Sequence, residues 1–453
     1  MKSRVINFLL LFLASATVYA QDTLSVLTFK DAVKIALQNN IILNQQRNLL
    51  FQNQVNKTYR IGQLGPQVSL NGNLGQRNGN SFIQQEGRVV NATVYGASGS
   101  INVSMPIFNG LSGVNTLRQA SSQLDAQMEM VNRSTQDIIN IVSTQFLAVL
   151  LDQELLKIAI ENHAALKKQH EQVKAQVELG ARSPVDEYNQ QALVSNAEVR
   201  VAQAEVVLVN DQSLLMQSLL VDPTVKTRIE EPSWDVNAIA MDNMSLDQLL
   251  IVASENRSDL KQAKYTEKAS KYGVHASKGN YLPSINASYS NGSAFNQLKG
   301  VRKDTSAYRD FNEQFNKDNR NNFIGLSLSI PIFTGFQNRM IYAQSKVLYE
   351  NSKLLTKGRE VLVKGDVIRA YQTYQSVQKA YSASVTGLEA SEVAYNLENE
   401  RYLLGITSFV DLANANRVYV QAQTDMAQAK YRFLFQKILL DYAVGTLKPE
   451  DIP

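Results

Sequence analysis

The chain has 453 residues, a formal net charge of +4 and no cysteine. Hydrophobic residues make up 44% of it and charged residues 19%, which is ordinary for a folded protein, and the small, dispersed positive charge gives no argument for nucleic-acid binding. The lack of cysteine excludes thiol chemistry, a cysteine-ligated metal and a lipid-modified N-terminal cysteine.

The N-terminal segment, residues 1–20, has the pattern of a secretory signal peptide. Lys2 and Arg4 precede an apolar run, and small residues follow up to Ala20, so the mature chain would begin at Gln21. An uncleaved anchor helix is the alternative, but the run is well short of the ~20 residues that a membrane span requires. We find no later apolar run long enough for a transmembrane helix, so entry into a membrane would have to use strands.

The rest of the chain is a duplication. The segment that starts at Thr28 resembles the one that starts at Ser245, 217 residues later. The sequence Pro-Ile-Phe-Asn-Gly, which ends at Gly110, recurs as Pro-Ile-Phe-Thr-Gly, which ends at Gly335, 225 residues later. The order of these features is the same in both copies, and the second copy carries an insertion of 8 residues (225 − 217).

We expect four segments along the chain. They are the signal peptide (1–20), a first repeat (21–220), an inter-repeat linker (221–243) and a second repeat (244–453). The linker lacks a clear period and holds Pro223, Pro232 and the only tryptophan, Trp234.

Period-two alternation predicts two strands in each repeat. Apolar residues alternate with small, uncharged ones over roughly ten residues, which is typical of the strands of a membrane barrel. A half-buried sheet in a soluble domain is the alternative reading. The apolar positions are Val68, Leu70 and Leu74; Ile101, Val103, Met105 and Ile107; Ile285, Ala287 and Tyr289; and Ile324, Leu326, Leu328, Ile330 and Ile332.

Polar loops are expected between the paired strands, over Arg77–Tyr95 and over Asn291–Asn322. The second loop carries the insertion and most of the charge. Long polar loops at one end of strand pairs are what outer-membrane barrels place outside the cell.

A very long helical stretch follows each Pro-Ile-Phe sequence. Apolar residues recur every seven residues from Leu117, which gives a coiled-coil-like seam. At 1.5 Å per residue, a helix over Leu111–Leu179 would be ~100 Å long, a returning helix over Val185–Leu220 ~54 Å, and a helix over Thr28–Ile61 ~51 Å. We therefore expect one long helix flanked by two shorter ones stacked end to end. The second repeat has the same arrangement over Phe336–Leu404, Phe409–Tyr442 and Ser245–Lys278.

A short turn joins two of these helices in each repeat. The first tip (residues 179–186) reads Leu-Gly-Ala-Arg-Ser-Pro-Val-Asp, and the second tip (residues 404–411) reads Leu-Gly-Ile-Thr-Ser-Phe-Val-Asp. Gly180 and Gly405 can adopt the left-handed conformation that ends a helix, and Ser183 and Ser408 can N-cap the next helix. Each turn is therefore predicted to be the tip of a helical hairpin.

Four strands cannot close a barrel, and open sheet edges are not tolerated in lipid. The chain must therefore oligomerise. A dimer would supply eight strands and a filled lumen, whereas a trimer would supply twelve strands and a lumen wide enough for a channel. The long helices would project from the side opposite the polar loops, which suits a tube across the periplasm.

These features, in this order and twice, resemble the TolC-type outer membrane efflux proteins (outer membrane factor family) over essentially the whole mature length. The closing sequence Ala-Val-Gly-Thr-Leu at residues 443–447 also fits. The resemblance implies an α+β membrane protein with two tandem repeats, each with two transmembrane β-strands and long periplasmic coiled-coil helices. It implies a homotrimer, with a 12-stranded β-barrel continued by an α-helical tunnel.

The resemblance also implies a place and a role. The protein would lie in the outer membrane of a Gram-negative-type cell, with its helices in the periplasm. It would be the exit duct of a tripartite efflux pump or a type I secretion system, which passively conducts substrates from an inner-membrane transporter and a periplasmic adaptor protein to the outside. Drugs, metal ions and proteins all stay open as cargo, and no cofactor is implied.

The family's gate lies at the tips, where the tunnel narrows and aspartates form a ring in the trimer. Asp411 matches the first ring aspartate, Asp186 is its counterpart in the first repeat, and Asn414 stands at the position of the second ring aspartate. Three carboxylates around a narrow lumen would favour cations. The alternative for Asp186 and Asp411 is that they are first-turn acids favoured by the helix dipole.

The family's closed entrance is tied by a tyrosine and an arginine, which the chain matches only in part. Tyr402 matches the tyrosine, Thr407 stands at the position of the arginine, and Arg182 lies at the equivalent position of the other repeat. The resemblance further implies that the adaptor docks on the tips, at Leu179, Gly180, Ala181, Arg182, Ser183, Leu404, Gly405, Ile406 and Ser408.

Two other functions fit the sequence less well than the duct does. An exported structural or adhesive coiled-coil protein would not need the four strands, and a passive porin would have no use for ~100 Å of helix. An enzyme is not expected, because the sequence shows no Gly-rich phosphate loop and no nucleophile elbow. The three histidines, His163, His170 and His275, make a poor metal site.

Overall fold

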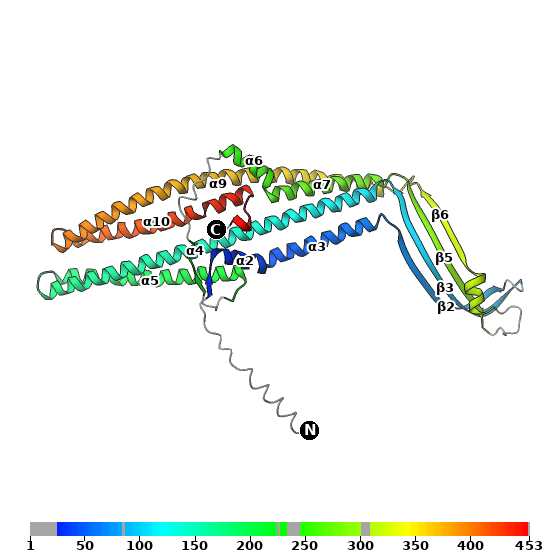
Figure 1. The fold of residues 1–453 in the computed structure, drawn as a ribbon, viewed down its shortest axis with the longest axis horizontal. Helices are drawn as coiled ribbons and strands as arrows, with labels where there is room; N and C mark the ends of the chain where they lie inside the picture. Colours follow the sequence, from blue (N-terminus) through cyan, green and yellow to red (C-terminus); the bar gives the residue numbers. More distant parts are fainter. Residues whose placement is uncertain are drawn as a thin grey trace, which may run out of the picture. The chain divides into compact units, whose positions relative to one another are not determined.

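A computed structural model describes residues 25–83, 87–222, 224, 227–232, 245–299 and 309–451 (Figure 1). The predicted signal peptide, Trp234 and most of the predicted linker lie outside the described residues. The chain divides into two compact units, which we call the sheet unit (residues 45–134 and 254–365) and the hairpin unit (residues 1–44, 135–253 and 366–453).

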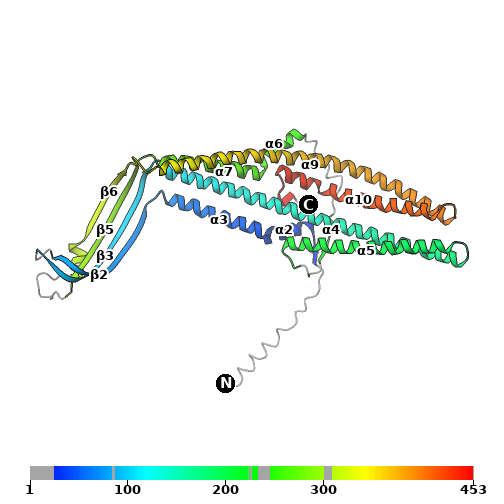
Figure 2. The same cartoon turned by 180° about the vertical axis from the view of Figure 1, so that it is seen from behind.

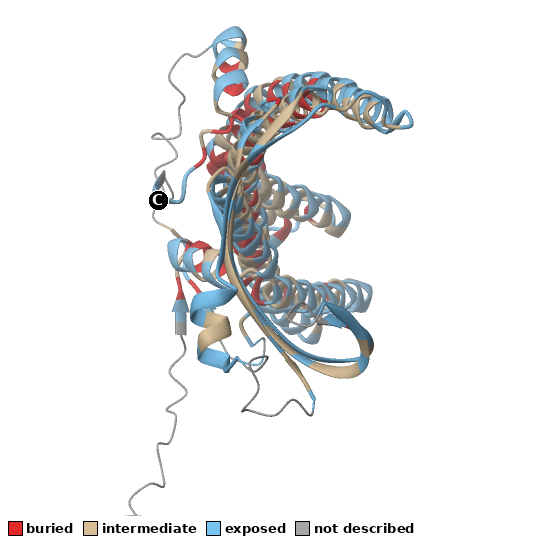
Figure 3. Ribbon diagram, turned by 90° about the vertical axis from the view of Figure 1, so that its right-hand side faces the viewer, coloured by how far each residue is buried: buried red, intermediate tan, exposed pale blue. Residues whose placement is uncertain are grey.

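The sheet unit contains the four predicted strands. β2 (Gln67–Ile83), β3 (Arg88–Asn109), β5 (Ser284–Leu298) and β6 (Asn321–Ser329) form one antiparallel sheet in the order β2-β3-β5-β6. The sheet is strongly curved (Figure 3).

The strand register places most of the predicted apolar residues on one side of the sheet, but Ile107 falls at a register shift, where Phe108 stands opposite Ile285. Leu70 pairs with Ile101, and Val103 pairs with Tyr289. Directly opposite residues in an antiparallel pair share a face, so the alternating sets form a single surface, which we call the apolar face. Leu74 on this face is 88% exposed in the single chain. A sheet with one exposed apolar face fits a strand set that borders lipid.

The predicted loop limits are partly wrong. Arg77–Tyr95 is not a loop, because β2 and β3 continue to pair as far as Ile83 and Arg88. The segment lacks the alternation of apolar and small residues from which the strands were predicted, but its backbone still pairs as regular strands. The second loop begins only after Leu298 and contains a short helix, α8 (Phe311–Glu313), and a π-helical turn, η2 (Gln314–Asp318). β6 also ends before two residues assigned to it, Ile330 and Ile332.

Both strand-to-helix corners use two consecutive left-handed residues. Gly110 and Leu111 each have φ 62° before α4 (Ser112–Glu178), and Gly335 and Phe336 have φ 58° and 66° before α9 (Gln337–Leu403). Gly110 is also closely packed, because a Cβ there would lie 2.3 Å from the carbonyl oxygen of Gly279. Only glycine fits that position.

The helices of the sheet unit meet through polar side chains. α3 (Ile41–Gly62) contacts the start of α4 through the Gln127 amide, which donates to the Gln46 carbonyl at 3.1 Å. α7 (Ser258–Gly279) contacts the start of α9 through the Ser270 and Ser352 hydroxyls, 2.9 Å apart.

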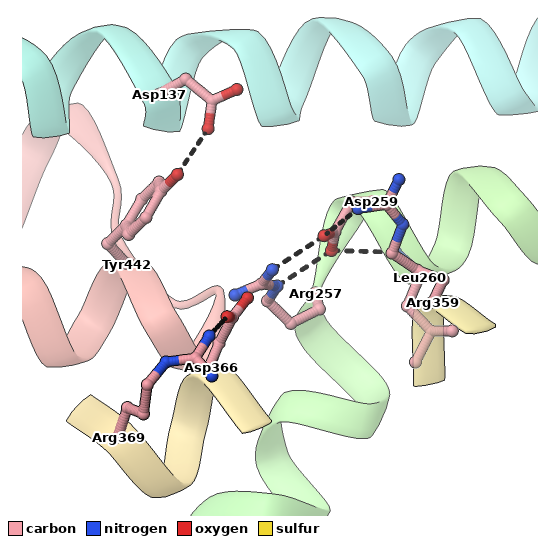
Figure 4. A network of polar contacts seen from close by, with 8 residues as sticks. All are labelled: Asp137, Arg257, Asp259, Leu260, Arg359, Asp366, Arg369 and Tyr442. Atoms are coloured by element: carbon pink, nitrogen blue, oxygen red, sulfur yellow. Dashed lines mark hydrogen bonds and ion pairs between the residues drawn. The ribbon is translucent and has the colours of Figure 1, made fainter. Parts of the chain in front are cut away.

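A buried ion pair lies at the start of α7. Arg257 is 2.7 Å from Asp259, and Arg359 is 3.7 Å from the same carboxylate (Figure 4). Burial opposes ionisation of Asp259, but the hydrogen bond and charge of Arg257 outweigh it and hold the pKa of this carboxyl below its usual value. The ion pair thus fixes the first turn of α7.

The hairpin unit is built from two antiparallel helix pairs and the elements around them. The second parts of α4 and α9 return through α5 (Pro184–Leu219) and α10 (Phe409–Val444). α2 (Phe29–Asn39), α6 (Leu246–Asn256) and a two-stranded parallel sheet of β1 (Ser25–Leu27) and β4 (Thr227–Ile229) complete it.

An aromatic cluster forms the core of the hairpin unit. The ring of Phe29 lies 5.2 Å from that of Phe146 on α4 and 5.5 Å from that of Phe435 on α10, and all three are buried. The closing sequence docks nearby, because the Gln136 amide donates to the Gly445 carbonyl at 3.0 Å. The Tyr442 hydroxyl donates to Asp137 at 2.9 Å (Figure 4). One helix from each repeat and the N-terminal helix therefore share this core.

The two short predicted helices at the start of the repeats are each interrupted. Thr28–Ile61 divides into α2 and α3 at Asn40, and Ser245–Lys278 divides into α6 and α7 at Arg257. Asn40 leaves the helical conformation (ψ 123°), and its side-chain oxygen accepts from the Leu43 N–H at 3.0 Å, as an N-cap does. Arg257 has a similar backbone (ψ 111°) and is held by Asp259. The long predicted helices are confirmed to within two residues at each end.

α4 also corrects the expectation that no later apolar run is long enough to span a membrane. It holds one 18-residue window that is apolar enough by composition, and 44% of that window is buried inside the protein. Buried Ile139, Val142, Phe146 and Leu150 recur at helical spacing, so core packing explains the apolar run.

Candidate functional site

The two tips lie at the ends of their helical hairpins, α4–α5 and α9–α10 (Figure 2), and they share one backbone geometry. At the end of α4, Gly180 (φ 72°) donates to the Val177 carbonyl and Ala181 donates to the Gln176 carbonyl, at 2.9 and 2.8 Å. These two bonds are a Schellman motif. At the end of α9, Gly405 (φ 75°) and Ile406 make the same pair of bonds, at 3.0 and 2.9 Å.

Each tip restarts with a serine N-cap, but the caps differ. Ser183 accepts from the Val185 N–H at 3.3 Å, and Pro184 occupies the first helical position. Ser408 accepts from the Asp411 N–H at 3.2 Å, and the Asp411 carboxylate accepts in return from the Ser408 N–H at 3.3 Å. This reciprocal arrangement is a capping box, which only the second tip has.

One contact joins the first tip directly to the end of α9 in the second hairpin. The Arg182 guanidinium lies 3.9 Å from the centre of the Tyr402 ring, and its Nη2 donates to the Tyr402 carbonyl oxygen at 2.5 Å. That carbonyl is among the last of α9, so the cation also meets the negative end of the helix dipole. Arg182 therefore binds both the ring and the backbone of Tyr402.

Tyr402 is the buried centre of the tip region. It is 2% exposed and packs with Val173 and Leu412, and Val177, Tyr395 and Phe409 surround this cluster. Its hydroxyl is buried without a hydrogen-bond partner among the described residues. Burial raises the pKa of the Tyr402 phenol against the opposing effect of Arg182, and Asp186 raises it further, so the phenol is neutral.

The second tip holds its own acid. The Ser408 hydroxyl donates to the Asp411 carboxylate at 2.6 Å, and the Thr407 hydroxyl donates to it at 3.2 Å. These hydrogen bonds, the Ser408 bond first, lower the pKa of Asp411, which is therefore ionised at neutral pH. The Asp411 side chain is exposed and its carboxylate caps α10.

The structure brings together some of the predicted site residues and separates others. Tyr402 meets Arg182, and Thr407 meets Asp411. Asp186 is half-buried in the first turn of α5, close enough to Tyr402 to influence its phenol, and Asn414 is exposed on α10.

Sequence reasoning missed Glu398, which anchors the second tip. The Thr407 hydroxyl donates to Glu398 at 2.5 Å, and Arg401 lies 3.2 Å from the same carboxylate. Only the i,i+3 spacing of Glu398 and Arg401 signalled an interaction in the sequence.

The contact between the two hairpins was also not foreseen. Two amide pairs contribute to it, because Asn416 donates to Asn162 at 3.3 Å and Gln169 donates to Asn399 at 3.2 Å. Such pairs are separated by more than 200 positions in the chain and leave no local sequence pattern.

Large apolar side chains project from both tips. Leu179 is 85% exposed, Leu404 74% and Ile406 64%. Exposed apolar groups rimmed by polar residues mark interaction surfaces. The tips thus combine a rigid turn, a buried tie between hairpins and an apolar surface.

Comparisons with known proteins identify the family. The family described as outer membrane efflux protein matches residues 33–219 and 249–446, which is most of the chain. The chain is 23% identical over 369 residues to the outer membrane protein TolC of Vibrio cholerae, which covers 78% of each protein. It is 21% identical over 363 residues to the outer membrane efflux protein BepC of Brucella suis, covering 80% of this chain and 75% of BepC.

The fold has solved counterparts. The outer membrane protein VceC of Vibrio cholerae superposes with a TM-score of 0.79 at 15% identity, over 92% of this chain and 96% of VceC. The family consists of channels rather than enzymes and implies trimeric assembly, so that three copies of the four-stranded sheet supply twelve strands. The chain belongs to the outer membrane efflux protein family and is an outer-membrane efflux channel of the TolC type.

Proposed function

We propose that this channel is the exit duct of a tripartite efflux pump or a type I secretion system, and that its tips dock a periplasmic adaptor fed by an inner-membrane transporter. The observation that carries the proposal is the pair of matching tips, each with a Schellman turn and an exposed leucine, Leu179 or Leu404. A trimer presents six such tips. Repeated apolar knobs on rigid turns suit a partner that repeats in the same way.

The gate would also lie at the tips. Asp411 is ionised and exposed, and three copies in a trimer would place a ring of carboxylates at the entrance, with Asp186 nearby in the first repeat. Such a ring favours cations and repels anions. Asn414 stands at the position of a second ring aspartate and carries no charge. The selectivity would therefore be set by one ring of carboxylates instead of two.

The tie between Arg182 and Tyr402 would hold the closed state, with Thr407 serving the cap of α10 instead. The latch arginine is thus supplied by the first tip. We place Arg182 in a first repeat (21–220) and Tyr402 in a second repeat (244–453), with a linker (221–243) between the two repeats.

The docking proposal is tested by crosslinking. The chain has no cysteine, so Leu179→Cys and Leu404→Cys each introduce one unique attachment point. In cells, a photo-crosslinker on either site should capture a periplasmic adaptor. A matched control at Val206, an exposed residue of α5 away from the tip, should not. Equal capture from all three sites would remove the tips as the docking surface.

The gate proposal is tested by electrophysiology. Asp411→Asn should reduce the cation preference of the reconstituted channel, measured as a shift of the reversal potential in a salt gradient. Asn414→Asp should increase it. An unchanged reversal potential in both variants would leave Asp411 as a helix cap alone.

A further inference from the structure

The second loop folds back onto the sheet. Its residues 309–320, which we call the wedge, comprise α8 and η2 with their flanks, and Figure 1 draws them in yellow-green beside the strands. β6 pairs with β5 only as far as Gly292, so the backbone groups of β5 beyond that residue lack a strand partner on the β6 side. Unpaired strand edges need to be covered.

The wedge covers this edge with side-chain hydrogen bonds. Asn319 donates to the Ala294 carbonyl at 2.6 Å, and Gln314 both accepts from the Asn296 N–H and donates to the Asn296 carbonyl, each at 3.1 Å. The Ser293 hydroxyl donates to the Phe315 carbonyl at 2.6 Å. The wedge is therefore fixed to β5 at three residues of the strand, Ser293, Ala294 and Asn296.

The face on which the wedge lies follows from Gly99. This residue pairs with Ser293 on β5 and is two residues from Ile101, so it belongs to the apolar face. A Cβ built on Gly99 would be 3.2 Å from Cζ of Phe315. The Phe315 ring thus fills the gap that glycine leaves in the apolar face.

An aromatic cluster continues from Phe315 along the same face. Phe311 stacks on Phe315 with ring centres 5.0 Å apart and lies 5.3 Å from Phe295, which also belongs to the apolar face. Phe311 is 52% exposed. The cluster stands at the loop end of the strands, beyond the aliphatic residues of the apolar face.

The charged residues of the wedge are either bonded within it, as Arg309, Asp310 and Glu313 are, or exposed, as Lys317, Asp318 and Arg320 are. Asp310 caps the first turn by accepting from the Glu313 N–H at 2.6 Å, and Arg309 lies 3.8 Å from the Glu313 carboxylate. Aromatic rings at the edge of an apolar band, beside polar groups that stay wet, are the composition of a membrane–water boundary.

We propose that the wedge is a lipid-interface anchor on the outside of the barrel, with the Phe311 and Phe315 rings in contact with lipid at the outer boundary of the membrane. The inference rests on the proposed channel, because it takes the apolar face as the lipid-facing one. The wedge sets the depth of the barrel in the membrane. The aromatic rings come from the loop because β3 has a glycine, Gly99, at that height on the apolar face.

Depth-dependent fluorescence quenching tests the anchor. The only tryptophan is removed by Trp234→Phe, and one tryptophan is then introduced in each variant: Phe311→Trp on the wedge, Leu326→Trp on the apolar face of β6, and Ser327→Trp on the opposite face. Trimers are reconstituted in phosphatidylcholine vesicles whose acyl chains carry bromine near the headgroup or near the chain end.

We expect shallow bromine to quench Phe311→Trp several-fold more than deep bromine does. Leu326→Trp should be quenched by brominated lipid, and Ser327→Trp only by aqueous acrylamide. If Phe311→Trp responds only to acrylamide while Leu326→Trp responds to lipid, the anchor is wrong and the barrel orientation stands. If Leu326→Trp also fails to respond to lipid, the orientation of the proposed channel is wrong as well.

A smaller substitution guards against disturbance of the ring stack. Phe311→Cys, labelled with a nitroxide, should be relaxed more strongly by dissolved oxygen, which concentrates in lipid, than by an aqueous nickel chelate. The reverse order would overturn the proposal independently of the tryptophan variants.

Discussion

The first tip and the second tip share a backbone and differ in what their side chains bind. Both use a Schellman turn and a serine cap. The first tip directs Arg182 onto Tyr402 of the other hairpin. The second tip directs Asp411 onto its own cap and Thr407 onto Glu398 and Asp411 of its own hairpin. The first tip is bound to the neighbouring hairpin, whereas the second tip is held by residues of its own hairpin.

The difference shows how two copies of one turn can keep the same backbone and make different side-chain contacts. The backbone geometry is fixed by glycine and serine, which both copies keep, so the copies could diverge at the neighbouring positions without losing the turn. The contact with Tyr402 then needs an arginine in the first tip only, at Arg182. In the second tip, Asp411 accepts its hydrogen bonds from the neighbouring residues Thr407 and Ser408. Four variants and their controls test this division.

Tyr402→Ala should have the largest effect. Truncation of a fully buried aromatic side chain costs about 3–5 kcal/mol, and here it also removes the surface on which Arg182 stacks. We expect a lower midpoint in urea unfolding of the trimer and a leaky resting channel. Tyr402→Phe is the matched control and should cost less than about 1 kcal/mol, because the hydroxyl has no partner among the described residues. A phenylalanine variant as unstable as the alanine variant would show that the hydroxyl carries the contact.

Arg182→Ala should come next. It removes a cation–π contact and a hydrogen bond to a helix carbonyl. We expect the free energy of unfolding to fall by about 2 kcal/mol, which is less than for a fully buried pair because Arg182 is only half-buried. The channel should open more often at rest, measured as current through single trimers. Thr407→Ala changes the equivalent position of the second tip and should leave resting closure nearly unchanged. If the two variants leak equally, the tips are not divided as described.

Asp152→Asn extends the comparison to the stems of the hairpins. Asp152 on α4 is buried beside Asp211 on α5, and burial, followed by a hydrogen bond with Asp211, raises its pKa to about 7. The equivalent positions of the second hairpin, 225 residues later, are Val377 and Gln436, neither of which ionises.

The sign of the pH effect follows from the raised pKa. From about pH 4 to pH 7 the unfolded chain loses the Asp152 proton while the folded chain keeps it, so the wild type becomes less stable as pH rises. Asparagine removes this dependence. The variant should melt a few degrees above the wild type at pH 8, and the gap should shrink towards pH 4. A gap that does not change with pH would show that Asp152 does not titrate in this range.

The caps should give the smallest effect. Ser408→Ala breaks a full capping box and should cost about 1 kcal/mol. Ser183→Ala loses one longer bond to Val185, and Pro184 still fixes the first helical residue, so a few tenths of a kcal/mol are expected. Hydrogen exchange at the first turns of α5 and α10 measures both. Equal costs would mean that the capping box adds nothing.

Much of the fold could be predicted because the repeat constrains it twice. The long helices end within two residues of their predicted limits, since the glycine and serine signals of the tips are local. The strand pairs followed from alternation at Leu70 and Leu326. The interruption at Asn40 carried a signal, an asparagine suited to cap α3, but its counterpart Arg257 is held by a buried ion pair that no local pattern reveals.

The candidate site was harder to predict than the fold. The resemblance pointed to Tyr402, Asp411 and Arg182, but not to the stack of Arg182 on Tyr402, which joins residues 220 positions apart. Glu398 was missed because its partner Thr407 lies across the end of α9. Contacts between distant segments depend on packing and leave no trace in local periodicity.

The extra length of the β2–β3 hairpin has a practical consequence. β5 stops pairing at Val94, whereas β2 and β3 continue together to Ile83 and Arg88, so the last part of the hairpin is a two-stranded ribbon that extends past the rest of the sheet. A strand needs only about 9–11 residues to cross a membrane, and β2 has 17. The ribbon mixes polar pairs, such as Asn80 with Asn91, with exposed apolar residues at its outer end, Phe82 and Val89. It is therefore the natural place to display a foreign peptide: an epitope inserted at Gly87 should be visible to antibodies on intact cells while export continues.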